Sequence, residues 1–144
     1  MNIKNILAHT DHTLLKQTAT WSDIMTLCDE AVAFGCASVC IPPTFVKMAK
    51  AYVEDKMKVC TVIGFPNGYH TSDVKAFEAS EAVKDGADEI DMVIDLGMVK
   101  MGNYEAVLKD IQTVKEGCHG RLLKVIIETC LLTDDEKIKL CKVV

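Results

Sequence analysis

The sequence predicts an α/β fold built from parallel βα units. Short runs rich in Val, Ile and Leu alternate with longer segments whose apolar residues recur at helical spacing. Hydrophobic residues make up 49% and charged residues 26% of the 144 positions, which is the balance of a globular chain. Because no linker or low-complexity tract interrupts the alternation, we expect residues 1–144 to form a single domain.

Five segments have the length and composition of strands in such a fold. Parallel strands are covered by helices on both faces, so they read as nearly continuous apolar runs. The expected strands are Leu7–Thr10, Ala37–Ile41, Lys58–Ile63, Glu89–Ile94 and Leu122–Ile127.

Helices are expected between these strands. One capping box begins at Thr20, with a helix-ending glycine at Gly35, and a second capping box begins at Thr133. Other helices are expected over Thr44–Val53, between His70 and Gly86, and over Tyr104–Glu116. The side chains expected in the core are Ile24, Leu27, Cys28, Ala31 and Val32 of the first of these helices and Val74, Phe77, Ala82 and Val83 of the third.

The composition argues against several kinds of partner. The formal net charge is -5 and no basic stripe is present, so we expect no nucleic-acid ligand. No apolar run reaches the ~18 residues of a membrane-spanning helix, and the N-terminal residues lack the apolar core of a signal peptide. Seven scattered cysteines indicate free thiols in the cytoplasm. Metal-binding and nucleotide-binding motifs are missing, so we expect no cofactor.

Two polar residues lie inside the apolar strand segments. In EIDMVID, residues 89–95, the strand period of two places the Ile and Met side chains under helices and Asp91 on the interior side. In LLKVIIET, residues 122–129, the same alternation sends Lys124 to the interior. Because an unpaired ammonium is costly to bury, we expect the Asp91 carboxylate and the Lys124 ammonium to share one enclosed space. Asp95 and Glu128, near the strand ends, are expected to be rim or turn residues.

Such a pair has two interpretations. A lysine and a carboxylate in a cavity of low dielectric constant shift each other's pKa, which suits proton transfer or imine chemistry. The alternative is a structural ion pair that fills the interior of the sheet. The sequence pattern favours the functional interpretation because both residues fall on neighbouring strands.

Three further residues are candidates with an equally simple structural alternative. Asp11 and Thr13 follow the expected first strand, on the rim where barrel enzymes place their sites, although an Asx-type turn would explain the same spacing. Cys40 faces inward by alternation, but a small buried thiol more often serves packing.

With these residues identified, the chain resembles the deoxyribose-phosphate aldolases. The matching segments occur in the family's order and span nearly the whole chain. They are DHTLL (11–15), SVCIPPTFV (38–46), VIGFPNG (62–68), GADEIDMVIDLG (86–97) and LLKVIIET (122–129). The resemblance implies a TIM (β/α)8 barrel, of which only about five βα units are present, so we expect a partial barrel.

The resemblance also implies a class I aldolase, a carbon–carbon lyase that needs no metal. Such enzymes reversibly cleave 2-deoxy-D-ribose 5-phosphate to acetaldehyde and D-glyceraldehyde 3-phosphate through a lysine Schiff base. The resemblance places Asp91 in the proton relay, makes Lys124 a supporting cation, and assigns Asp11, Thr13 and Cys40 to the substrate pocket. Local chemistry alone would make Lys124 the imine-forming amine, but the resemblance gives that role to a lysine in a KTSTG-type motif on the sixth strand.

This sequence contains no KTSTG-type motif. We therefore expect a C-terminally truncated chain that is inactive alone, and the open sheet edges predict a homo-oligomer. Two alternatives remain at this stage. One is a non-catalytic half-barrel that serves as an assembly protein. The other is a transaldolase-like sugar-phosphate enzyme, against which the order of GADEID and LLKVIIET argues.

Overall fold

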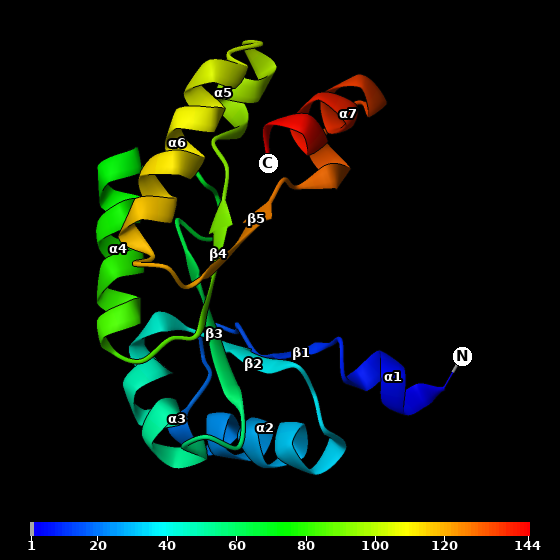
Figure 1. The fold of residues 1–144 in the computed structure, drawn as a ribbon, viewed down its shortest axis with the longest axis vertical. Coiled ribbons are helices and arrows are strands. Elements are labelled where there is room, and N and C mark those ends of the chain that lie inside the picture. The colour runs from blue at the N-terminus through cyan, green and yellow to red at the C-terminus, as the bar shows by residue number, and fades with distance from the viewer. Residues whose placement is uncertain (1) are drawn as a thin grey trace. The chain divides into compact units, whose positions relative to one another are not determined.

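The structure, a computed structural model, describes residues 2–144. Five strands form one sheet in which the spatial order follows the chain order, as consecutive βα units produce (Figure 1). The strands are β1 (Asp11–Thr13), β2 (Ser38–Ile41), β3 (Lys58–Ile63), β4 (Glu89–Val93) and β5 (Leu122–Ile126). The pairs β1–β2 and β2–β3 are parallel, and the predicted α/β class is confirmed.

Helices alternate with the strands. They are α1 (Ile3–Leu7), α2 (Trp21–Phe34), α3 (Val46–Val53), α4 (Ser72–Lys84), α5 (Leu96–Lys100), α6 (Tyr104–Gly117) and α7 (Asp134–Val143), with 3-10 turns at Pro43–Phe45 and Thr129–Leu131. Both predicted capping boxes form, at Thr20 and at Thr133, and Gly35 ends α2 in the left-handed conformation. Among the helices of residues 2–144, none is long and apolar enough to cross a bilayer.

The chain divides into two compact units. Unit 1 contains Met1–Val62 and Ala82–Glu89, and unit 2 contains Ile63–Glu81 and Ile90–Val144. The expectation of a single domain over the whole chain stays a prediction.

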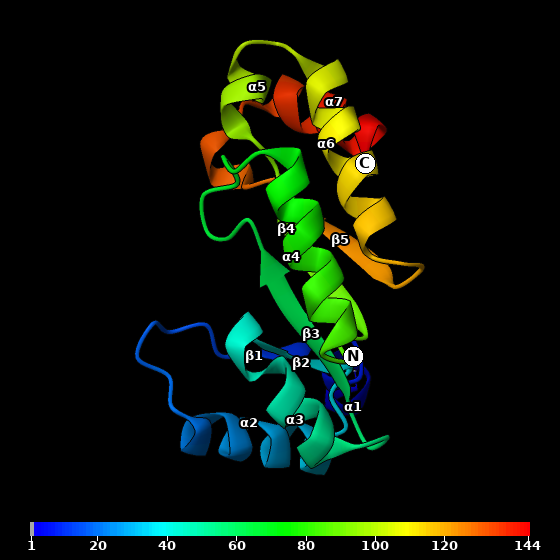
Figure 2. The same ribbon diagram turned by 90° about the vertical axis from the view of Figure 1, so that its left-hand side faces the viewer.

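In unit 1, helices α2 and α3 lie side by side and supply much of the core (Figures 1 and 2). The Trp21 ring joins them by stacking on Phe45, with centroids 6.4 Å apart, and by meeting Tyr52 edge-on at 5.9 Å. The buried residues of α2 are those that the helical period indicated, namely Ile24, Leu27, Cys28 and Ala31. Val32 was wrongly expected among them, since it is 40% exposed.

In unit 2, helices α4 and α6 lie side by side (Figure 2). Their backbones come so close that a Cβ atom on Gly117 would lie 2.5 Å from the carbonyl oxygen of Ala76. The apolar side of β4 is buried as predicted, with Ile90, Met92 and Ile94 fully shielded from solvent. Strand β5 is only partly buried, because it is the last strand of the sheet.

The predicted first strand was misplaced. Residues 7–10 contain the end of helix α1 and a turn, and the strand itself begins at Asp11. The Asn2 side chain caps α1, and the Thr10 hydroxyl donates to the carbonyl oxygen of Ile6. A helix of five residues is too short to show helical periodicity. Asp11 and Thr13 therefore lie within the strand and not in the loop that follows it.

Of the core residues predicted for α4, Ala82 is buried as expected, but the two nearest the start of the helix were wrong. Val74 and Phe77 are 46% and 65% exposed, while Lys75 and Ala79 are completely buried. The helix is thus rotated so that a lysine points inward. Helix α5 was not predicted, again because it is short.

The loop between β3 and α4 generates a test of backbone packing. Gly68 has a φ of +75°, and a Cβ atom there would lie 1.9 Å from the carbonyl oxygen of Ile94. Gly102 has a φ of +73° with nothing within 4 Å of its Cβ position. We expect Gly102→Ala to lower the free energy of unfolding by about 1 kcal/mol through backbone strain alone. Gly68→Ala should lower it by about 3 kcal/mol or more, because the clash adds to the strain.

Chemical denaturation of the two variants measures this difference. Equal losses would show that the loop moves away from Ile94 at no cost.

Candidate active site

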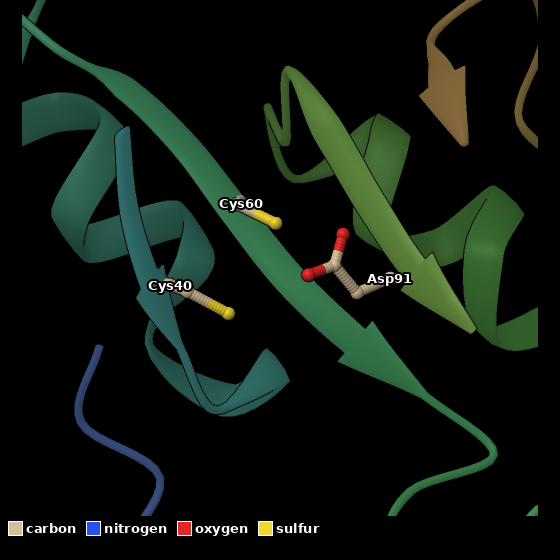
Figure 3. A group of neighbouring side chains, drawn as sticks. All are labelled: Cys40, Cys60 and Asp91. Carbon is tan, nitrogen blue, oxygen red and sulfur yellow. The ribbon is translucent and has the colours of Figure 1, made fainter. Parts of the chain in front are cut away.

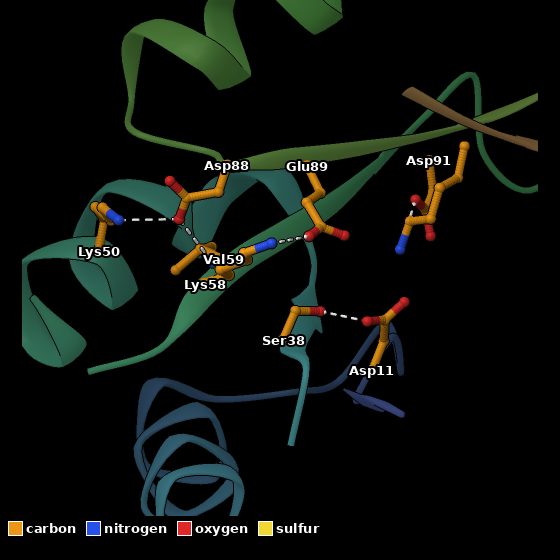
Figure 4. Close-up of polar contacts among 9 residues, drawn as sticks. Asp11, Ser38, Lys50, Lys58, Val59, Asp88, Glu89 and Asp91 are labelled. Atoms are coloured by element: carbon orange, nitrogen blue, oxygen red, sulfur yellow. Dashed lines mark hydrogen bonds and ion pairs between the residues drawn. The ribbon is translucent and has the colours of Figure 1, made fainter. Parts of the chain in front are cut away.

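The Asp91 and Lys124 side chains meet in unit 2. Asp91 lies on β4 and Lys124 on β5, and the Lys124 Nζ atom is 3.2 Å from the Asp91 Oδ1 atom. Figure 4 shows the Asp91 carboxylate projecting from its strand. The two groups are therefore close together, as expected. They meet because side chains alternate between the two faces of a strand, and Asp91 and Lys124 fall on the same face.

The space that they share is more open than the sequence indicated. The Asp91 side chain is 15% exposed and the Lys124 side chain is 33% exposed. Strand β5 is the last in the order of the sheet, and within residues 2–144 no further strand pairs with it. Water therefore screens the pair from the side of Lys124, while the Asp91 Oδ1 atom itself is buried.

The neighbouring acidic residues have structural roles. Asp95 is the N-cap of α5, and its Oδ1 atom accepts hydrogen bonds from the backbone N–H groups of Gly97 (2.8 Å) and Met98 (3.3 Å). Glu128 has a left-handed backbone and accepts a hydrogen bond from the Cys130 thiol, which raises the pKa of that thiol. The expectation that both acids lie outside the strands as rim or turn residues is confirmed.

Asp11 and Thr13 lie on the same side of β1 in unit 1. The Ser38 hydroxyl, directly across on β2, donates to the Asp11 Oδ1 atom at 2.7 Å (Figure 4). The Thr13 hydroxyl donates to the Asp11 carbonyl oxygen at 2.8 Å. Asp11 is therefore held by a strand-to-strand hydrogen bond, and Thr13 is exposed.

Cys40 follows on β2, opposite Thr13 in the strand register. Its register partner on β3 is Cys60, and the two thiols point the same way in Figure 3. Cys40 is 3% exposed and forms a small apolar cluster with Cys60, Val62 and Leu15. The packing role that the sequence left open for Cys40 has direct support here.

A second polar group of unit 1 surrounds the start of β4. The Lys50 ammonium on α3 donates to the Asp88 Oδ2 atom at 2.9 Å, and the backbone N–H of Val59 donates to the same oxygen at 3.0 Å (Figure 4). Lys58 pairs with Glu89, which is 7% exposed. The Lys58 ammonium, which donates to the Glu89 Oε1 atom at 3.1 Å, compensates for the burial of that carboxylate.

A buried ion pair between α4 and α6 was not predicted from the sequence. The Lys75 ammonium donates to the Asp110 Oδ2 atom at 2.6 Å and to the carbonyl oxygen of Val93 at 3.0 Å. Lys75 is fully buried and Asp110 is 5% exposed. A lysine inside a helix usually points to solvent. The only sequence signal for the burial of Lys75 is the apolar residue Ala79, which lies four residues later on the same face of the helix.

These placements fit an active site at the middle of β4 and β5 in unit 2. A carboxylate in contact with an ammonium can accept and return a proton while the cation stabilises its charged form. The Lys124 side chain is partly exposed to solvent. Neither feature by itself identifies a substrate.

Comparison with known proteins supplies the family. The model of the DeoC/LacD family of aldolases matches residues 5–141. The deoxyribose-phosphate aldolase of Clostridioides difficile (strain 630) is 53% identical over 142 residues, which are 99% of this chain and 65% of that protein. The deoxyribose-phosphate aldolase of Streptococcus pyogenes serotype M4 is 54% identical over 144 residues, with 100% and 65% covered. The chain thus spans 65% of the length of these relatives.

Solved structures of deoxyribose-phosphate aldolases are also similar to this chain. A Coccidioides immitis protein assigned as a deoxyribose-phosphate aldolase superposes with a TM-score of 0.95 at 38% identity, over 99% of this chain and 57% of its own. The tetrameric deoxyribose-phosphate aldolase of Aeropyrum pernix superposes with a TM-score of 0.85 at 29% identity, over 99% of this chain and 60% of its own. The partial-barrel prediction is consistent with this coverage. The chain belongs to the DeoC/LacD family of aldolases.

Proposed function

We propose that this chain carries the proton-transfer part of a deoxyribose-phosphate aldolase site. The observation that carries the proposal is the 3.2 Å contact between the Asp91 carboxylate and the Lys124 ammonium, in the two sequence segments most typical of the family. The family match does not favour a non-catalytic half-barrel or a transaldolase-like enzyme.

The proposed reaction proceeds through an imine. An enzyme amine condenses with the aldehyde of open-chain 2-deoxyribose 5-phosphate and releases water. Removal of the proton from the C3 hydroxyl breaks the C2–C3 bond, which releases glyceraldehyde 3-phosphate and leaves an enamine. Protonation of the enamine carbon and hydrolysis then release acetaldehyde. Asp91, with Lys124 beside it, is proposed to relay the protons of these steps.

Three residues of unit 1 are proposed to contact substrate. Asp11 offers a carboxylate oriented by Ser38, and Thr13 offers an exposed hydroxyl. Cys40 would contribute a small apolar wall. For Cys40 the packing cluster is the competing explanation.

The compartment and the assembly are proposals as well. All seven cysteines are free thiols, which suits the reducing cytoplasm. Homo-oligomer formation is supported by the terminal position of β5 and by Leu122 on it, which is 50% exposed.

The role of Asp91 can be tested in an active protein. We would fuse these 144 residues to the remaining part of the Clostridioides difficile relative and measure cleavage of 2-deoxyribose 5-phosphate. Asp91→Asn should lower kcat about 10²-fold or more with a smaller effect on KM, because it removes a proton acceptor and preserves shape. Asp95→Asn is the matched control, since asparagine caps a helix as well as aspartate does. A similar loss in both variants would contradict the assignment.

The imine-forming amine is proposed to lie outside these 144 residues. We expect borohydride reduction of the isolated chain with 2-deoxyribose 5-phosphate to leave its intact mass unchanged, whereas the fused protein should gain a substrate-derived adduct. The expectation rests on the missing KTSTG-type motif. An adduct that maps to Lys124 in the isolated chain would overturn it and would make Lys124 the nucleophile.

Self-association is measurable directly. Light scattering of the isolated chain should give a mass above 15.8 kDa that falls on dilution. Leu122→Lys places a charge on the exposed edge and should reduce the mass toward that of a monomer. A monomeric parent chain with cooperative unfolding would argue against the proposal.

A further inference from the structure

Lys75 is the largest of the fully buried side chains among the described residues. The proposed reaction does not use its charge. Lys75 lies on α4 in unit 2 and points toward the carboxyl ends of β3 and β4. Its aliphatic stem runs over Gly64, where a Cβ atom would lie 2.9 Å from the Lys75 Cδ atom. No residue with a side chain fits there without displacing the lysine.

Burying an ammonium requires compensation. Removal from water costs several kcal/mol unless acceptors replace the lost hydration. Lys75 has two such acceptors, the Asp110 Oδ2 atom at 2.6 Å and the carbonyl oxygen of Val93 at 3.0 Å. Well-packed apolar residues often stabilise a protein as much as a buried ion pair does. An apolar residue at position 75 could fill the same space but could not donate a hydrogen bond to the Val93 carbonyl oxygen. The specific effect of Lys75 is therefore to hold that carbonyl in place.

That carbonyl stands beside the proposed active site. Val93 follows Asp91 by two residues on β4, so both residues point to the same side of the strand. One residue later, the backbone N–H of Ile94 donates to the carbonyl oxygen of Ile126, at 3.3 Å. Ile126 in turn follows Lys124 by two residues on β5. The end of β4 is thus held by Lys75 from the helix layer and by β5 from the sheet.

Helix α4 holds the neighbouring strand end as well. Glu78, one turn after Lys75, accepts a hydrogen bond from the backbone N–H of Gly64 at 2.7 Å. The first turns of α4 therefore fix the chain directly after β3 and at the end of β4 through two charged side chains.

We infer that Lys75, anchored by Asp110, is a positioning residue that sets the Asp91 carboxylate against the Lys124 ammonium. It acts through the Val93 carbonyl and does not touch substrate. The inference rests on the proposed function only in taking Asp91 and Lys124 as the reacting pair.

The test uses a double variant of the isolated chain, Lys75→Met/Asp110→Leu. Both replacements are apolar and similar in size, so the fold should survive while the hydrogen bond to Val93 is lost. Two nuclear magnetic resonance signals report the result: the carboxyl ¹³C resonance of Asp91, and the hydrogen-exchange rate of the Ile94 amide. We expect the Asp91 resonance to move or broaden and the Ile94 amide to exchange about tenfold faster or more.

Lys50→Met is the matched control. Lys50 also lies on a helix, bonds a carboxylate at 2.9 Å and runs its stem over a glycine, since a Cβ atom on Gly86 would lie 2.8 Å from its Cγ atom. It belongs to unit 1, so both signals should stay at their parent values.

A folded double variant with unchanged Asp91 and Ile94 signals would overturn the inference and leave Lys75 as filling of the core. If the double variant does not fold, Asp110→Asn keeps the shape and weakens the anchor, and unchanged signals there overturn the inference equally. Both signals report position and not turnover. An inactive fused protein would therefore contradict the proposed function while leaving this inference standing.

Discussion

The contact between Asp91 and Lys124 is the constraint on which the rest depends. Each residue interrupts an apolar strand, and each would be costly to bury alone. Together, at 3.2 Å, they permit β4 and β5 to lie side by side with polar groups on the same face. Their partial exposure keeps the side chains hydrated enough to lower the cost of burying the pair.

Much of the fold could be predicted because its signals are local. The capping boxes at Thr20 and Thr133 fixed two helix starts to the residue, and β3 has the predicted bounds. The first strand could not be placed, because a five-residue helix shows no period and its capping by Asn2 depends on one side-chain hydrogen bond. Strand alternation indicated the Asp91–Lys124 contact, which needs only a period of two and neighbouring strands.

The Lys75–Asp110 pair could not be predicted for a different reason. The two residues are 35 positions apart, and each is ordinary on a helix surface. Helical period alone favoured Val74 and Phe77 as the core face of α4, yet tertiary contacts rotated the helix toward Lys75. The carbonyl at the end of β4 and the missing side chain at Gly64 decide this rotation, and neither has a sequence signal at position 75.

Lys75 and Lys124, both in unit 2, show how different surroundings give identical side chains different properties. Lys75 is fully buried, has two short hydrogen bonds and a stem fixed against Gly64, so its ammonium cannot reach a substrate. Lys124 is one-third exposed, and its Nζ atom lies 3.2 Å from the Asp91 Oδ1 atom, which is the longer of the two lysine–carboxylate contacts. A rigid cation suits positioning and an exchangeable one suits chemistry. The helix layer therefore carries the fully buried charge, and the strand face carries the partly exposed one, which is the charge proposed to take part in the chemistry.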